Sequence, residues 1–275
     1  MTTWHPKVFV LTALLTGSGS LPACETSLKL TGAESIKTCD PHVAGCTRAD
    51  KLVHDYTEAV PDDSKLFTIA LQSSPWRFYD QEMRILTPEE LAAMIKRQIE
   101  PGFQKVSLIA SWTGVAPDRG GKSLAQKLSD ALGGFPVTGM DGFLWMSKDG
   151  STHTTHQAFS TKQGRGAYFA MEGDDVMVSL AAGWPAEVED KIVEKNDAAG
   201  LMRAGAAWDI YMLCPEHALK TFEAAAKMSN SIAAYNAALM RLERNGEGDV
   251  EAAKALLSQA AEAGDKKAQE KLRKL

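Results

Sequence analysis

The sequence lacks a surplus of basic residues: its formal net charge is −5, and no basic stripe stands out along the chain. Since proteins that bind nucleic acid gather lysine and arginine on one face, this composition argues against nucleic acid as a partner. The apolar run at the N-terminus, Val8–Leu15, is well short of the roughly 20 residues that a transmembrane helix needs. Cysteines number only four, and no second Cys or His pair stands at zinc spacing beside Cys39 and Cys46. The proportions of hydrophobic and charged residues are those of an ordinary globular protein. The chain of 275 residues is long enough for one large domain or two modest ones.

The first 23 residues have the layout of a bacterial secretory signal. Lys7 precedes the apolar run, small residues follow it at 16–20, and Leu21-Pro22-Ala23-Cys24 ends the segment. This ending resembles the lipobox of bacterial lipoproteins, although Pro22 departs from the small or branched residue usual there. The resemblance implies that Cys24 is acylated and that the chain is periplasmic, anchored to the outer membrane. Export without lipid, and a cytoplasmic chain with an accidental apolar start, are the alternatives.

Residues 24–63 are polar and irregular, which predicts a tether. Cys39 and Cys46 enclose turn-forming residues in it, so we expect a small disulfide loop there. If Cys24 carries lipid, Cys214 has no partner left and is expected to be a small buried hydrophobe in a helix. If Cys24 is not lipidated, two disulfides with three possible connectivities fit the four cysteines.

Residues 64–185 alternate between strand and helix signals. A capping box with proline at the first helical position, Thr87-Pro88-Glu89-Glu90, begins one helix, and Ser123–Leu132 predicts a second. Turn signals at 149–150 and 172–175 predict hairpins. Apolar runs predict strands at 66–71, 106–110, 135–138, 143–146, 167–171 and 176–180. This order predicts a mixed α/β domain with a partly parallel sheet and flanking helices.

Residues 186–275 contain no convincing strand and repeat themselves with a helical pattern. Five positions recur 35 residues later: Phe222, Ala225, Ala226, Asn230 and Ala233 correspond to Leu257, Ala260, Ala261, Asp265 and Ala268. A period near 35 predicts stacked helix pairs. The loop 245–248 separates two of these helices, with Asp249 expected to cap the second.

The segments 233–239, 245–248, 253–257 and 260–265 resemble the Sel-one-like branch of the tetratricopeptide repeats. The resemblance covers about the last 45 residues and implies a protein-binding scaffold with no chemistry of its own. Two copies are few for a solenoid, so the alternative is that these helices dock on the α/β part and act as a packing cap.

Ala116–Ser123 fits a loose phosphate-loop pattern between a strand and a helix, with Ala116 in place of the first glycine. The expected strand ends several residues early, and no apolar strand ending in Asp supplies a convincing magnesium partner. A glycine-rich connection, in which Ser123 caps the helix, therefore explains the pattern better.

The segments Leu108–Gly114, Ser123–Leu132 and Pro136–Gly139 resemble the nucleophile strand and helix of caspase-like cysteine peptidases. Ser111 stands where that family has its catalytic cysteine, and Gln72-Ser73-Ser74 stands where it has His-Gly. Because a serine hydroxyl without a neighbouring base is a poor nucleophile, the resemblance implies an inactive relative. A hydrolase that uses Ser111 is the runner-up.

His153 and His156 have metal-ligand spacing only if they lie on a helix, whereas a strand, which we expect here, turns them to opposite sides. We therefore predict no metal and no cofactor. The candidate contacts for a protein partner lie in the loop 112–122 and on the repeat, and they are Trp112, Arg119, Tyr235, Arg241 and Arg244.

Together these features predict an exported, non-enzymatic protein of the bacterial cell envelope that binds another protein. Small exported lipoproteins with such repeats resemble immunity proteins that neutralise secreted antibacterial effectors, including phospholipases. An envelope scaffold or assembly factor is a further alternative.

Overall fold

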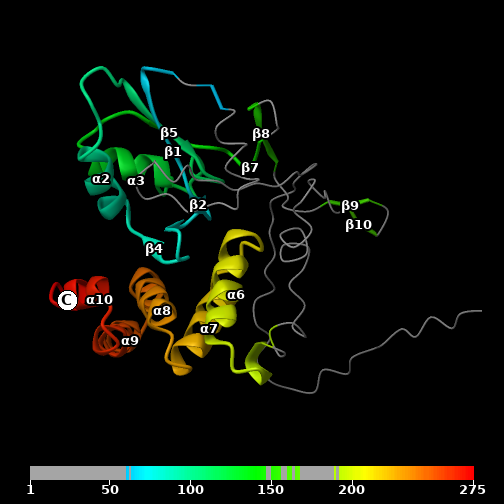
Figure 1. The fold of residues 1–275 in the computed structure, drawn as a ribbon, viewed down its shortest axis with the longest axis vertical. Helices are drawn as coiled ribbons and strands as arrows, with labels where there is room; N and C mark the ends of the chain where they lie inside the picture. Colours follow the sequence, from blue (N-terminus) through cyan, green and yellow to red (C-terminus); the bar gives the residue numbers. More distant parts are fainter. Residues whose placement is uncertain are drawn as a thin grey trace, which may run out of the picture.

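The computed structural model describes residues 60–61, 63–146, 150–155, 160–162, 165–167, 189 and 192–275. The predicted signal, nearly all of the tether with Cys24, Cys39 and Cys46, and the hairpin expected at 172–175 lie outside the described residues. The described chain has an α/β region followed by a run of packed helices (Figure 1). This confirms the predicted fold class.

The centre of the α/β region is a parallel three-stranded sheet of β1 (Leu66–Ala70), β5 (Lys105–Ile109) and β6 (Val137–Thr138), in the order β1-β5-β6. Helix α2 (Pro88–Lys96) precedes β5, and α3 (Leu124–Ala131) connects β5 to β6. The two helices contact each other and lie side by side next to the parallel strands (Figure 1). Their apolar faces and the buried strand residues form one core.

Both helices begin at capping boxes. The Thr87 hydroxyl accepts from the Glu90 amide while the Glu90 carboxylate accepts from the Thr87 amide, as the sequence predicts. Ser123 and Gln126 make the same reciprocal pair at α3. Each pair satisfies two amides that a helix start leaves without partners, which fixes where the helix begins.

A short antiparallel meander joins the two parts of the molecule. It consists of β2 (Gln72–Ser73), β3 (Phe78–Tyr79) and β4 (Ile85–Leu86), in the order β2-β3-β4. Neighbouring strand residues point to opposite faces. Phe78 and its cross-strand partner Leu86 therefore enter the α/β core, while Tyr79 and Ile85 enter the core of the helices. The meander is a wall shared by two hydrophobic cores.

Two further hairpins complete the described strands. Strands β7 (Phe143–Met146) and β8 (Thr152–Thr155) are antiparallel, as are β9 (Ser160–Lys162) and β10 (Arg165–Ala167). Gly150, in the predicted turn between β7 and β8, has a φ of 81° that favours glycine.

The C-terminal part contains α6 (Ala198–Ile210), α7 (Pro215–Lys227), α8 (Ser231–Arg244), α9 (Asp249–Glu262) and α10 (Lys266–Leu272). Each helix packs on the next. Residues 35 apart have the same role: the side chains of Asn230 and Asp265 cap α8 and α10 by accepting from the amides of Ala233 and Ala268. This packing is consistent with helical repeats.

Helix α8 is the centre of the helical part. Residues Ala233–Met240 are all buried, because α7 and α9 flank the helix and β4 contacts it from a third side. Helix α9 begins differently from the prediction: Gly248, with a φ of 74°, is the N-cap, and Asp249 is the first helical residue. Among the described helices, none is long and apolar enough to cross a membrane.

Candidate functional site

A cluster of charged side chains, buried at Arg77 and Asp209 and exposed at Glu243, holds the meander against α6 and α8. Arg77 Nη1 donates to Asp209 Oδ1 at 2.6 Å, and Arg77 Nη2 lies 2.6 Å from Glu243 Oε2. The Tyr79 hydroxyl donates to the second oxygen of Asp209 at 2.8 Å. Burial and the negative charge of Asp209 raise the pKa of Tyr79 well above its ordinary value. Burial opposes the charge of Arg77, but Asp209 and Glu243 outweigh it and raise the pKa of Arg77.

A second set of polar contacts joins the β3–β4 turn to α8 and α10. The Asn236 side chain accepts from the Ile85 amide and donates to the Met83 carbonyl, each at 2.8 Å. The side-chain amide of Asn236 thus satisfies one backbone donor and one backbone acceptor of the β3–β4 hairpin. Arg84 pairs with Asp265, the N-cap of α10, and lies over the Tyr235 ring at 5.2 Å from the ring centroid. Burial raises the pKa of Tyr235.

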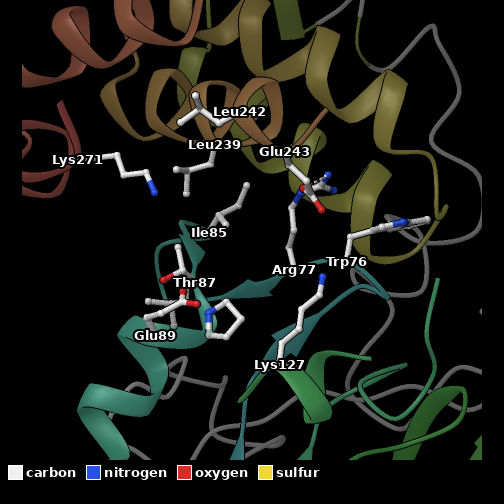
Figure 2. Close-up of a pocket in the computed structure, with 12 residues that line it drawn as sticks. Trp76, Arg77, Ile85, Thr87, Glu89, Lys127, Leu239, Leu242, Glu243 and Lys271 are labelled. Carbon is white, nitrogen blue, oxygen red and sulfur yellow. Dashed lines mark ion pairs between the residues drawn. The ribbon is translucent and has the colours of Figure 1, made fainter. Parts of the chain in front are cut away.

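A pocket with a volume of about 290 Å³ opens between these two sets of contacts. Figure 2 shows the pocket with β4 and the start of α2 on one side and α8 on the other. Its lining comes from the meander, α2, α3, α8 and α10: Trp76, Arg77, Ile85, Leu86, Thr87, Pro88, Glu89, Lys127, Leu239, Leu242, Glu243 and Lys271. The pocket therefore exists only because the two parts of the chain are packed together.

The charged residues around the pocket differ in their partners. Arg77 and Glu243 are paired with each other. Within the part of the chain that the structure describes, the ammonium groups of Lys127 and Lys271 have no hydrogen bond or ion pair, and neither has the carboxylate of Glu89. Lys127 and Lys271 extend into the space from α3 and α10 (Figure 2).

Ser111, the runner-up nucleophile, makes hydrogen bonds that join neighbouring segments of the α/β part. Its Oγ accepts from the Leu144 amide at 3.0 Å, and its carbonyl accepts from Ser73 Oγ at 2.6 Å. No described His, Asp or Glu side chain is in hydrogen-bond contact with this hydroxyl, so it has no base to remove its proton among these residues. The hydroxyl instead fixes β7 next to the end of β5.

The phosphate-loop pattern and the paired histidines gain no support. Ser123 uses its hydroxyl to cap α3, as the glycine-rich connection predicts. His153 lies in β8 opposite Trp145, and His156 is outside the described residues. The described residues contain no group of three or more His, Cys, Asp or Glu side chains that could hold a metal ion.

Two of the predicted partner contacts are buried, which corrects their proposed role. Trp112 is 1% exposed and packs edge-on against Phe143, with 5.3 Å between ring centroids. The sequence left open whether its ring is exposed or in the core, and the structure places it in the core. Tyr235 is 2% exposed and lies against the β3–β4 turn under Arg84. Neither ring can anchor a partner on the surface.

Arg241 and Arg244 form ion pairs with other residues of the same chain. Both pair with Asp249, whose side chain is buried, and Asp249 also accepts from the Gly246 amide at 2.8 Å. The hydrogen bonds from Arg244 and Arg241 lower the pKa of Asp249. The two arginines therefore hold the turn between α8 and α9. Arg119, by contrast, lies exposed in the glycine-rich loop.

Cys214 precedes α7 and is buried, and it is disulfide-bonded rather than a lone thiol. Its bonding partner lies outside the described residues, which include no other cysteine. Since the chain has three further cysteines, Cys24, Cys39 and Cys46, one of them must bond Cys214. An acylated Cys24 and a Cys39–Cys46 loop cannot then occur in the same chain.

A separate polar cluster lies at the start of α7. His217 Nε2 is 2.8 Å from Glu189 Oε2, and Thr221 donates to the other oxygen at 2.9 Å. Burial opposes the charge of Glu189, but the hydrogen bonds from His217 and Thr221 lower its pKa. The His217 ring lies 4.0 Å from that of Trp208. These contacts attach residue 189 to the helical part.

The residues that join the two parts of the chain were not identified from the sequence. They lie where the meander contacts α6, α8 and α10, a boundary that we call the seam. Asp209 and Asn236 are polar residues within apolar helical stretches, and a buried polar side chain needs a partner. That signal could have identified both as contact residues. Nothing in the local sequence around Lys127 or Lys271 indicates that they line one pocket.

Comparison with known proteins adds one finding. Residues 41–154 match the model of a family described as a domain of unknown function (DUF8616). The match covers the meander, the parallel sheet and most of the β7–β8 hairpin, and it ends before the C-terminal helices. No curated protein and no solved structure matches the chain. The α/β part is thus similar to a protein family whose activity is not described.

Proposed function

We propose that this chain is an exported protein of the bacterial cell envelope that binds another protein and has no catalytic chemistry of its own. The observation that carries the proposal is the repeated packing of the C-terminal helices. Positions 35 residues apart share the same caps and the same buried contacts, which is the organisation of helical arrays that bind proteins.

The disulfide at Cys214 supports export. Structural disulfides form and persist in oxidising compartments such as the bacterial periplasm and are rare in the cytosol. A chain that carries one agrees with the secretory layout of residues 1–23 and with an anchor at Cys24. If Cys24 is the anchor, Cys214 must bond Cys39 or Cys46.

The environment of Ser111 supports a non-enzymatic role. Its Oγ is occupied by the Leu144 amide, so the group that a hydrolase would need as its nucleophile holds two strands together. Among the predicted partner contacts, Arg119 is the residue that the fold leaves exposed and unpaired in the described structure. We therefore place the first partner contact at the loop 116–121.

The finer proposal is that the partner is a secreted antibacterial effector, such as a phospholipase, and that this chain gives immunity to it. This step rests on the likeness to small exported repeat lipoproteins that act as immunity proteins. The prediction is that deletion of the gene makes cells sensitive to the effector encoded beside it. Deletion strains that stay fully resistant would contradict immunity but leave protein binding open.

Affinity purification of the tagged mature chain from its native envelope tests protein binding itself. We expect one stoichiometric partner, and Arg119→Glu should reduce its recovery because the substitution reverses the charge of an exposed contact. The matched control is Arg97→Glu, the same change at the exposed residue that follows α2. Equal recovery with both variants would contradict the role of the loop, and recovery of no partner would contradict the proposed function.

A further inference from the structure

The net charge of the whole chain conceals a local excess of positive charge at the last helix. Residues 266–275 contain four lysines, one arginine and one glutamate, so their side chains carry +4. Since the whole chain carries −5, everything before residue 266 carries −9. Figure 1 shows α10 at the outer end of the row of helices, next to α9. The end of the helical part therefore differs in sign from the rest of the chain.

The cations of this segment share one side of α10. At about 3.6 residues per turn, positions three and four apart are neighbours on a helix surface. The chain keeps turning after α10 ends, since the Lys274 amide donates to the Lys271 carbonyl. Ala268 and Leu272 take the opposite side and pack on the core of the helices. The side away from this core, which we call the basic face, consists of Lys266, Lys267, Lys271, Arg273 and Lys274.

Acidic side chains compensate only part of the basic face. Lys267 lies 3.5 Å from Glu90 of α2, and Lys274 lies 2.6 Å from Glu270. Glu89 is unpaired but lines the same pocket as a member of the face, so we count it as a third acid. Five cations then oppose three acids, which leaves an excess of positive charge. Within the described part of the chain, no carboxylate pairs with the other three members, Lys266, Lys271 and Arg273.

The pKa of Glu270 shows that several of these cations act on one point. The hydrogen bond from Lys274 lowers the pKa of Glu270, and the charges of Lys274, Arg273 and Lys267 lower it further. These residues lie before and after Glu270 in the sequence. The basic face is therefore one concentrated field rather than a series of separate charges.

The stability of α10 does not explain why the face begins where it does. Lys266 and Lys267 are the first two helical residues, where the positive end of the helix dipole disfavours a cation. Glu90 offsets the charge of Lys267, whereas Lys266 is exposed and has no counter-charge among the described residues. Residues that oppose a local structural preference are expected where function requires them.

An exposed leucine adjoins the basic face. Leu275 is 46% exposed, and among the described residues only Val193 is a comparably exposed large hydrophobic side chain. Cations next to an exposed apolar side chain are typical of segments that lie on a membrane. The cations attract anionic headgroups while the apolar group enters the boundary of the hydrocarbon. Four of the five cations are lysines, whose compact charge suits a diffuse field better than a two-pronged contact.

We propose that the basic face, together with Leu275, binds the surface of an anionic phospholipid bilayer. Each effective cation near such a surface contributes about fivefold in affinity, so a modest excess of charge gives half-saturation at about 1–10 mM lipid. The contact is thus weak and reversible. It goes beyond the proposed function, because it needs neither lipid at Cys24 nor a protein partner at the loop 116–121.

Cosedimentation of the purified, unlipidated protein with vesicles tests this contact. The vesicles contain phosphatidylcholine alone or phosphatidylcholine mixed with phosphatidylglycerol. We expect binding to the mixed vesicles at least about tenfold stronger than to the neutral ones, because only the mixed vesicles attract the basic face. A rise in ionic strength from about 0.05 to 0.2 M should weaken the binding severalfold, since salt screens exposed charges.

Charge variants give effects of opposite sign and so separate binding from loss of fold. Lys266→Gln and Arg273→Gln should each weaken binding to the mixed vesicles about three- to fivefold, whereas Glu270→Gln should strengthen it by a similar factor. Leu275→Ser should weaken it about threefold. The matched control is Lys220→Gln, an exposed and unpaired lysine of the described structure that lies on α7, and it should leave binding unchanged. Circular dichroism checks that each variant is folded.

Three results would overturn the proposal. The first is equal binding, or none, to the neutral and mixed vesicles. The second is an equal effect of Lys266→Gln, Arg273→Gln and the control Lys220→Gln. The third is tighter binding of polyglutamate or double-stranded DNA than of mixed vesicles at the same concentration of negative charge, because the face would then recognise another macromolecule. None of these results would affect the affinity purification, which tests the loop 116–121.

Discussion

Asp209 is the single residue on which the seam between the two parts depends most. Its carboxylate is fully buried and accepts from both Arg77 and Tyr79, which come from the opposite part of the chain. Removal of one member of a buried ion pair leaves the other charge without compensation in a poorly solvated place. The energetic cost of such a change is therefore much larger than for a pair on the surface.

Asp209→Ala should lower the free energy of unfolding by about 3–5 kcal/mol, measured by urea denaturation. The comparison variant is Glu243→Gln, which removes the more exposed partner of the same arginine and should cost less than about 1 kcal/mol. In an Arg77→Met background, Asp209→Ala should cost far less than in the wild type. Equal losses for Asp209→Ala and Glu243→Gln would show that the buried pair does not hold the seam.

Tyr79 should make the protein sensitive to alkaline pH. Its folded-state pKa lies above the value of about 10 in the unfolded chain, so its contribution to stability is complete below pH 10 and is lost as pH rises further. The free energy of unfolding should fall by up to about 1.4 kcal/mol per pH unit from this group. Tyr79→Phe should show a shallower slope above pH 10. Identical slopes in the two proteins would contradict this assignment.

At the scale of elements, the two helix pairs α7–α8 and α9–α10 are capped at corresponding positions, but they differ in one contact. Asn230 caps α8, and Asp265, 35 residues later, caps α10. Asp265 has an additional role because it also pairs with Arg84 of the meander. The second unit is thus attached directly to the α/β part through its cap.

The two roles of Asp265 can be separated by substitution. Asp265→Asn keeps a side-chain acceptor for the cap and loses the charge opposite Arg84, while Asp265→Ala loses both. We expect Asp265→Ala to cost about 1 kcal/mol more than Asp265→Asn, which is the usual value of an N-cap. Asn230→Ala should show the cost of a cap alone. Thermal or urea unfolding measures all three, and equal losses for the two Asp265 variants would contradict the capping role.

At the scale of the whole molecule, the described structure is one body with two cores and a common wall. The meander sends Phe78 and Leu86 into one core and Tyr79 and Ile85 into the other. The contacts on the helical side come from α6, α8 and the start of α10. Consequently the meander covers part of the surface of α6, α8 and α10, and the pocket lies at the edge of the seam.

The disulfide of Cys214 should join the helical part to the N-terminal residues. Peptide mapping without reduction should find Cys214 bonded to Cys24, Cys39 or Cys46, and reduction should lower the free energy of unfolding by about 2–4 kcal/mol. Unreduced Cys214→Ser should be about as stable as the reduced wild type. In any chain that carries lipid at Cys24, the partner should be Cys39 or Cys46. A free thiol at Cys214 would contradict the bond.

The sequence alone determined the local elements, because their signals act between residues a few positions apart. The capping box at Thr87 and the apolar run at 66–71 have this short range, and the caps Asn230 and Asp265 recur in a repeat of only 35 residues. From these signals the fold class followed correctly. Tertiary structure decided which side chains meet across the seam. Arg77 and Asp209 are 132 residues apart, and no periodicity encodes that distance.

The same distinction explains the corrections. For Trp112 the glycine-rich loop allowed either an exposed or a core position, and only the contact with Phe143 in the folded chain decides that its ring is buried. Lys127 and Lys271 belong to different parts of the chain, and only the docking of those parts makes both of them line one pocket. Local sequence specifies backbone conformation through short-range hydrogen bonds, whereas a site depends on long-range packing, which only the folded chain supplies.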